Sequence, residues 1–99
     1  MYLRIWEYVV TPDAEDEFVA AYGADGDWAR LFARAAGYAG TELFRGAGSR
    51  DRFLTVDRWW DEAAWTAFLE RWQEDYRALD VALAPLTTRQ RLLLEGPSP

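Results

Sequence analysis

One carboxylate is the first candidate for chemistry because it interrupts an otherwise apolar strand. Asp57 lies two residues before Trp59 in the segment RFLTVDRWW. If its side chain points into the protein, loss of water raises its pKa and makes it suitable as a general base. The alternative is a structural role, because buried carboxylates are usually paired, and Arg4, Arg45 or Arg89 on other strands can supply the partner.

Trp59 and Thr55 lie on the same strand face as Asp57, since side chains alternate along a strand. An indole at this position either lines a pocket, where it stacks on a flat substrate, or fills the core under a helix. Aromatic residues of the expected helices are further candidates for the pocket wall, with ordinary core packing as the alternative. These are Trp65, Trp72, Tyr76, Tyr22 and Trp28.

Two absent residue types exclude several kinds of catalytic site. The 99-residue chain has no Cys and no His. Zinc sites built on these residues, haem ligation by either of them, and Ser-His-Asp or Cys-His catalysis are therefore excluded. The carboxylates show no EF-hand spacing, and we expect no metal site.

The charge and hydropathy pattern also narrows the expected partners. The formal net charge is −6, and every basic residue is Arg, so no positive surface for nucleic acid is expected. No apolar run approaches the roughly 20 residues that a bilayer-spanning helix needs. The first ten residues do not resemble a signal peptide, and we expect a cytoplasmic protein without a membrane partner.

The first third of the chain reads as a strand followed by a broken helix. Residues 2–10 alternate with both sets largely apolar, which predicts a strand buried on both faces. Thr11 or Asp13 can cap the helix that follows. Gly23 and Gly26 interrupt that helix and can allow a lid to move, although an ordinary helix corner is the alternative. Asp27 can cap a second segment over residues 28–36.

The rest of the chain predicts a hairpin, a long helix and a last strand. The strands cover residues 38–46 and 52–60, with a loop at 47–51. Asp61 can cap the long helix and Pro85 marks its end. A strand over residues 87–95 follows. Together the elements form one domain over residues 1–96, with a frayed tail at 97–99.

The resulting order, β-α-β-β-α-β, is the ferredoxin-like arrangement of the α+β class. It predicts a four-stranded antiparallel sheet with helices on one face only. The other face is then apolar and exposed, and such a face is normally an interface. We therefore expect two chains to pack sheet against sheet as a homodimer, a dimeric α+β barrel.

Several segments form a pattern known from one family: Gly37-Tyr38, Thr41-Glu42-Leu43, residues 53–59, residues 62–80 and Leu86-Thr87. In these segments the chain resembles the antibiotic biosynthesis monooxygenase superfamily of dimeric α+β barrels. The segments cover most of the chain, and the pattern is more specific for the fold than for an activity. The haem-degrading branch of this superfamily uses His and Asn, neither of which occurs here.

Another branch of the family oxidises electron-rich phenolic polycycles, such as anthrone-like polyketides, directly with O2 and without metal or flavin. The Trp that this branch uses at the end of its third strand corresponds to Trp59. Its Asn on the same strand corresponds to Thr55, and its Tyr falls near Trp65. Arg89 or Arg91 can supply its Arg.

The resemblance thus implies a cofactor-independent monooxygenase that acts on an aromatic or polyketide-type small molecule. Asp57 is its expected base, Trp59 its stacking wall and Arg89 its anion stabiliser. Three alternatives remain open. The first is a non-catalytic binder of hydrophobic small molecules, and the second is a structural or interaction module whose aromatic residues only pack. The third is a polyketide cyclase or isomerase that uses the same base.

Overall fold

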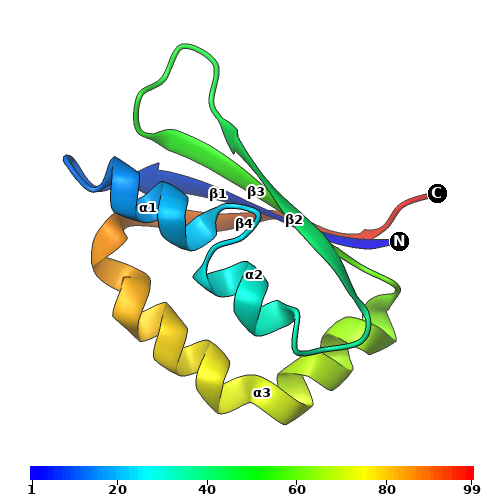
Figure 1. The fold of residues 1–99 in the computed structure, drawn as a ribbon. Coiled ribbons are helices and arrows are strands. Elements are labelled where there is room, and N and C mark those ends of the chain that lie inside the picture. Colours follow the sequence, from blue (N-terminus) through cyan, green and yellow to red (C-terminus); the bar gives the residue numbers. More distant parts are fainter.

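The structure, a computed structural model, describes residues 1–99 as one sheet covered by helices on a single side (Figure 1). The strands are β1 (Tyr2–Val10), β2 (Tyr38–Arg45), β3 (Arg52–Trp59) and β4 (Thr87–Pro97). The helices are α1 (Glu15–Tyr22), α2 (Asp27–Phe32) and α3 (Glu62–Leu83), and one 3-10 turn, η1 (Ala84–Leu86), follows α3.

The sheet has the strand order β2-β3-β1-β4, and all neighbouring strands are antiparallel. This confirms the ferredoxin-like α+β arrangement expected from the order of elements. The sheet has an inner face, which packs against the helices, and an outer face without any cover. No helix in the chain is long and apolar enough to cross a bilayer.

Strand β1 shows the difference between the two faces. Tyr8 and Val10 on the inner face are buried, whereas Leu3 and Ile5 on the outer face are only partly buried. The expectation that this strand is buried on both faces is therefore wrong for a single chain. Its outer residues are apolar except Glu7, but no helix of the same chain packs on them.

The N-terminus of α3 follows its sequence signal. Asp61 is the N-cap, and its Oδ1 accepts a hydrogen bond of 2.8 Å from the backbone N–H of Ala64. The helix ends at Leu83 and continues as the η1 turn that contains Pro85. The expected cap and stop of this helix are thus both confirmed.

The caps expected for the two short helices are wrong. Ala14 is the N-cap of α1 and no side chain caps that helix, because Asp13 adopts a left-handed turn with φ of 68°. Gly26 is the N-cap of α2, so Asp27 lies in its first turn. Helix α2 also ends at Phe32, four residues earlier than expected, and a series of turns leads into β2.

A glycine bulge in β2 decides which residues of that strand face the helices. The register between β2 and β3 shifts between Tyr38 and Gly40, and Gly40 has a φ of 123°. Residues with a side chain rarely adopt this backbone conformation, so the position requires glycine. Because of the extra residue, Tyr38 and Thr41 both lie on the inner face although they are three residues apart.

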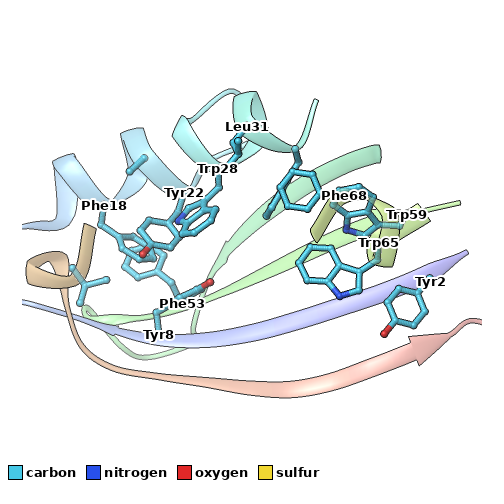
Figure 2. Close-up of a cluster of buried hydrophobic side chains, with 13 residues drawn as sticks. Tyr2, Tyr8, Phe18, Tyr22, Trp28, Leu31, Phe53, Trp59, Trp65 and Phe68 are labelled. Carbon is cyan, nitrogen blue, oxygen red and sulfur yellow. The ribbon is translucent and has the colours of Figure 1, made fainter. Parts of the chain in front are cut away.

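The core is aromatic and lies between the helices and the inner face of the sheet. Figure 2 shows two gatherings of these side chains. Tyr8, Tyr22, Trp28 and their neighbours lie towards one end of the strands, and Trp59, Trp65 and Phe68 lie towards the other end. Rings of the second group pack closely, with the centroids of Trp59 and Phe68 5.3 Å apart.

The two chain ends lie side by side at one edge of the molecule (Figure 1). Strand β4 continues to Pro97, two residues beyond its expected end. The backbone N–H of Ser98, in the segment expected to be frayed, donates a hydrogen bond of 2.7 Å to the carbonyl oxygen of Met1.

Candidate functional site

The candidate site is a cavity between the sheet and the helices, at the end of the core near Tyr8. The centres of water-sized spheres can occupy a volume of about 60 Å³ in it. This is room for about four water molecules. Every element except η1 contributes to its wall, which consists of Trp6, Tyr8, Tyr22, Trp28, Phe32, Thr41, Thr55, Asp57, Tyr76, Asp80 and Gln90.

Asp57 is the carboxylate of the sheet that faces this cavity. It lies on the inner face of β3, together with Thr55, and is 7% exposed. None of the arginines that the sequence offered as partners forms an ion pair with it. Its only hydrogen bond comes from Thr41 Oγ1, which donates to Asp57 Oδ1 at 2.6 Å.

Burial raises the pKa of Asp57 from 3.8 to about 6. The hydrogen bond from Thr41 and the charge of Arg4 both act in the opposite direction, but they do not cancel the loss of water. At neutral pH the group is therefore mostly ionised, yet it accepts a proton far more readily than an exposed Asp. These are the properties of a general base that works near pH 7.

Two hydroxyl groups connect Asp57 with the edge of the sheet. Thr41 has only one hydroxyl proton and gives it to Asp57, so Tyr38 must donate the hydrogen bond of 2.6 Å that joins its hydroxyl to Thr41 Oγ1. The Gly40 bulge makes this chain possible, because it places both residues on the inner face. The chain holds Oδ1 of Asp57 and leaves Oδ2 free of hydrogen bonds.

Three aromatic rings close the cavity on the helix side. The centroid of the Trp28 ring lies 5.0 Å from that of Tyr76 and 6.3 Å from that of Tyr22. Burial raises the pKa of both tyrosines, so their hydroxyl groups stay protonated and can donate hydrogen bonds. Asp80 follows Tyr76 by one helical turn and lies on the same face of α3.

The kink in α3 lets one helix serve both ends of the core. Trp72 has non-helical backbone angles, with φ of −119° and ψ of 26°. Trp65 and Phe68 precede the kink and pack in the closed core, whereas Tyr76 and Asp80 follow it and line the cavity.

The structure brings five of the nine expected site residues to the cavity wall: Asp57, Thr55, Tyr22, Trp28 and Tyr76. It places Trp59, Trp65 and Trp72 elsewhere. Trp59 is fully buried under Phe32 and Phe68, Trp65 stacks on Phe68, and Trp72 stacks on the other side of Phe68. These three residues pack in the core, which was the alternative to a place in the pocket wall.

Arg89 lies on the opposite side of the sheet from the cavity. It pairs with Val9 in the β1–β4 register, on the outer face, and lines a separate shallow cleft there. The cation nearest to Asp57 is Arg4, its direct cross-strand neighbour on the inner face. Arg4 forms an ion pair with Glu95, and its guanidinium lies 4.1 Å from the ring centroid of Trp65.

The sequence interpretation missed six wall residues: Trp6, Tyr8, Phe32, Thr41, Asp80 and Gln90. The alternation of β1 already placed Trp6 and Tyr8 on one strand face with Arg4, so the sequence indicated that these two side chains point the same way. The spacing of Asp80 from Tyr76 was also a usable signal. Thr41 was not recognisable, because its direction depends on the bulge at Gly40.

Comparisons with known proteins agree with this architecture. The family model described as antibiotic biosynthesis monooxygenase matches residues 1–78, and the chain belongs to this family. A comparison with curated protein sequences found no match. Several solved structures have a similar fold, at sequence identities low enough that the likeness shows the fold alone; three of them serve as examples.

The first is SnoaB, a cofactor-independent oxygenase from Streptomyces nogalater, with 20% identity, a TM-score of 0.68 and coverage of 98% of this chain and 94% of that one. A protein from Bordetella bronchiseptica has 18% identity, a TM-score of 0.73 and coverage of 99% and 96%. One from Nitrosomonas europaea has 18% identity, a TM-score of 0.69 and coverage of 98% of both chains. Both of the latter are described as putative antibiotic biosynthesis monooxygenases.

Proposed function

We propose that this protein is a monooxygenase-like enzyme that oxidises an electron-rich aromatic or polyketide-type molecule with O2 and without a cofactor. The observation that carries the proposal is Asp57, a buried carboxylate with a pKa of about 6 and no ion-pair partner, facing a cavity with an aromatic wall. Membership of the monooxygenase family and a fold shared with SnoaB support it.

In the proposed reaction, Asp57 takes a proton from a phenolic hydroxyl group of the substrate. The resulting anion gives one electron to O2, and the substrate radical and superoxide combine into a peroxide. Asp57 returns its proton to the peroxide anion, and the hydroperoxide loses water to leave a carbonyl group. A CH2 group and O2 thus become C=O and H2O. Tyr22 and Tyr76 supply neutral hydroxyl donors for the anion.

The size of the cavity sets a condition on this proposal. Ligand pockets usually have volumes of roughly 300–1,000 Å³, which a polycyclic substrate also requires. The wall must therefore move when such a substrate enters. Tyr22 and Trp28 lie on either side of the segment that contains Gly23 and Gly26, and we propose that this corner acts as the lid.

The homodimer and the cytoplasmic location belong to the same proposal. The outer face of the sheet carries Phe44 and Leu94, which are 48% and 54% exposed, beside Leu3, Ile5 and Leu54. Such a face favours sheet-to-sheet pairing of two chains. Light scattering after gel filtration should give twice the mass of the chain. The mass of one chain, 11.4 kDa, would contradict the pairing.

Oxygen uptake by chelator-treated protein tests the activity. The substrates are anthrone-like compounds and other electron-rich phenols, and the variants are Asp57→Asn and, as a control, Glu74→Gln. Glu74 is exposed on α3 and lies outside the cavity. We expect uptake with a quinone product that falls at least a hundredfold in Asp57→Asn and is unchanged in the control. Equal uptake by all three proteins would remove Asp57 from the mechanism.

A binder without catalytic activity is the second candidate function. Thr55 occupies the position at which the resemblance implies an Asn, and this difference favours binding over oxidation. Quenching of Trp fluorescence by an aromatic ligand, with no product after long incubation, would support it. A cyclase or isomerase would instead convert the ligand without consuming O2, because proton removal by Asp57 is enough for such a reaction.

A further inference from the structure

The wall of the cavity carries negative charge and no positive charge. Asp57 and Asp80 are its two ionisable acids, and none of its residues is Arg or Lys. Neither carboxylate forms an ion pair, although the chain has seven others. These join Asp or Glu to Arg4, Arg30, Arg34, Arg45, Arg52, Arg58 and Arg91.

Arg4 forms no ion pair with either acid, although its charge opposes the rise that burial causes in the pKa of Asp57 and in that of Tyr76. Its guanidinium is bound by Glu95 and lies over the ring of Trp65 and near the ring of Trp6. Asp80 is partly buried, and no Arg pairs with it. Charged groups that lose part of their water usually have a partner of opposite charge, and beside Asp80 a cationic ligand can take that place.

The rings beside Asp80 form three sides of an aromatic cage. Trp28 lies between Tyr22 and Tyr76, and it meets their rings at angles of 53° and 57°. Aromatic faces attract cations, and cages of this kind recognise quaternary ammonium groups.

We propose that the cavity selects an organic cation, an amine or quaternary ammonium compound. Its charged group lies among Tyr22, Trp28 and Tyr76 beside Asp80, and the rest of the molecule extends towards Asp57. The inference uses the same cavity as the proposed function and rests on it for the aromatic part of the ligand. A positive group on the substrate also offsets the charge of the phenolate that the proposed reaction forms.

Three probes of similar size test the selection by charge. They are meta-hydroxyphenyltrimethylammonium, its neutral carbon analogue meta-tert-butylphenol, and the anion meta-hydroxybenzoate. Titration followed by Trp fluorescence and calorimetry should show about tenfold tighter binding of the cation than of the neutral analogue. The anion should bind most weakly. Equal affinity for all three, tighter binding of the anion, or no binding of any probe would overturn the proposal.

Two variants on the same helix locate the charged group. Asp80→Asn should weaken binding of the cation about fivefold to tenfold and leave the affinity for meta-tert-butylphenol unchanged. Glu74→Gln removes an exposed acid outside the cavity and should change neither affinity. An equal effect of both substitutions would show that net charge, rather than the cage, attracts the cation. Thermal unfolding of each variant shows that it is folded.

The binding experiment and the oxygen-uptake experiment fail independently. A preference for the cation without any oxidation supports the inference and contradicts the oxygenase. Oxidation of neutral phenols without a preference for the cation supports the oxygenase and contradicts the inference.

Discussion

The two ends of the space between sheet and helices are built from similar aromatic residues but differ in what they enclose. At one end, Trp59, Trp65 and Phe68 close on each other and leave no cavity. At the other end, Tyr22, Trp28 and Tyr76 surround a cavity that reaches Asp57 (Figure 2 shows the first two of these rings). The aromatic content alone therefore does not indicate where a ligand binds.

The difference comes from the polar residues of β3. Trp59 at the end of the strand offers the helices an apolar surface, and they pack directly on it. Thr55 and Asp57 offer polar atoms, which the face of an aromatic ring cannot satisfy. Thr55 instead donates to the hydroxyl of Tyr8, and Asp57 accepts from Thr41. A pocket next to these atoms keeps room for a ligand or for water. In β3, the polar residue Asp57 therefore indicates the ligand-binding cavity better than the neighbouring Trp59 does.

The largest expected effect is at the closed end. Trp59→Ala should lower the free energy of unfolding by about 4 kcal/mol, because it removes a fully buried indole and leaves a cavity. Urea denaturation at neutral pH measures this loss. Trp6 lines the cavity and is only partly buried. A smaller loss of unfolding free energy in Trp59→Ala than in Trp6→Ala would contradict the tighter packing of the closed end.

At the open end, removal of a charge should stabilise the protein. Folding raises the pKa of Asp57 from 3.8 to about 6, so the folded state binds the proton more tightly than the unfolded state. The resulting penalty is absent below pH 3.8, grows as the pH rises through 6, and reaches about 3 kcal/mol at neutral pH. The free energy of unfolding of Asp57→Asn should therefore exceed that of the natural chain by up to this amount at pH 7.5 and by almost nothing at pH 3.5.

Denaturation of both proteins at the two pH values measures this gain. A variant that is less stable than the natural chain at pH 7.5 would show that the carboxylate is satisfied in the folded protein, which would contradict the account of an unpaired acid.

An intermediate effect is expected at the bulge. Gly40→Ala places a side chain at a φ of 123°, which should cost about 2 kcal/mol in the free energy of unfolding. It should also weaken the hydrogen bond between Tyr38 and Thr41. Gly48→Ala is a matched control, because Gly48 also has a positive φ but lies in the loop between β2 and β3 and is not part of the cavity wall. Both variants should lose stability, and only Gly40→Ala should change the pKa of Asp57.

The smallest effect concerns a single hydrogen bond. Thr41→Val removes the donor to Asp57, and loss of that bond should raise the pKa of the carboxyl group above about 6. Because the base acts in its ionised form, oxygen uptake should fall as the pH drops through this pKa. The acidic limb of the pH profile should then move to higher pH in Thr41→Val. An unchanged limb would show that another group controls the rate.

The sequence was sufficient for the order of elements, because this follows from local periodicity. It placed Asp57 on one strand face with Thr55 and Trp59 but left open which face of the sheet this is, since a register shift of one residue reverses it. It was not sufficient to separate Trp59 from the cavity wall. Trp59 and Asp57 both lie on the inner face of β3. Only the packing of Phe32 and α3 decides that Trp59 is covered and that Asp57 faces the cavity. Arg89 was misplaced for a similar reason, since its face depends on the β1–β4 register.

A structure of the protein with a bound electron-rich phenol, grown without oxygen to prevent turnover, tests the central claim most directly. The account predicts that the phenol lies in the cavity with its hydroxyl group within hydrogen-bonding distance of Asp57 Oδ2, and with Trp59 still enclosed by its neighbours. A phenol stacked on Trp59, or bound on the outer face of the sheet beside Arg89, would contradict the assignment of the open end as the functional site.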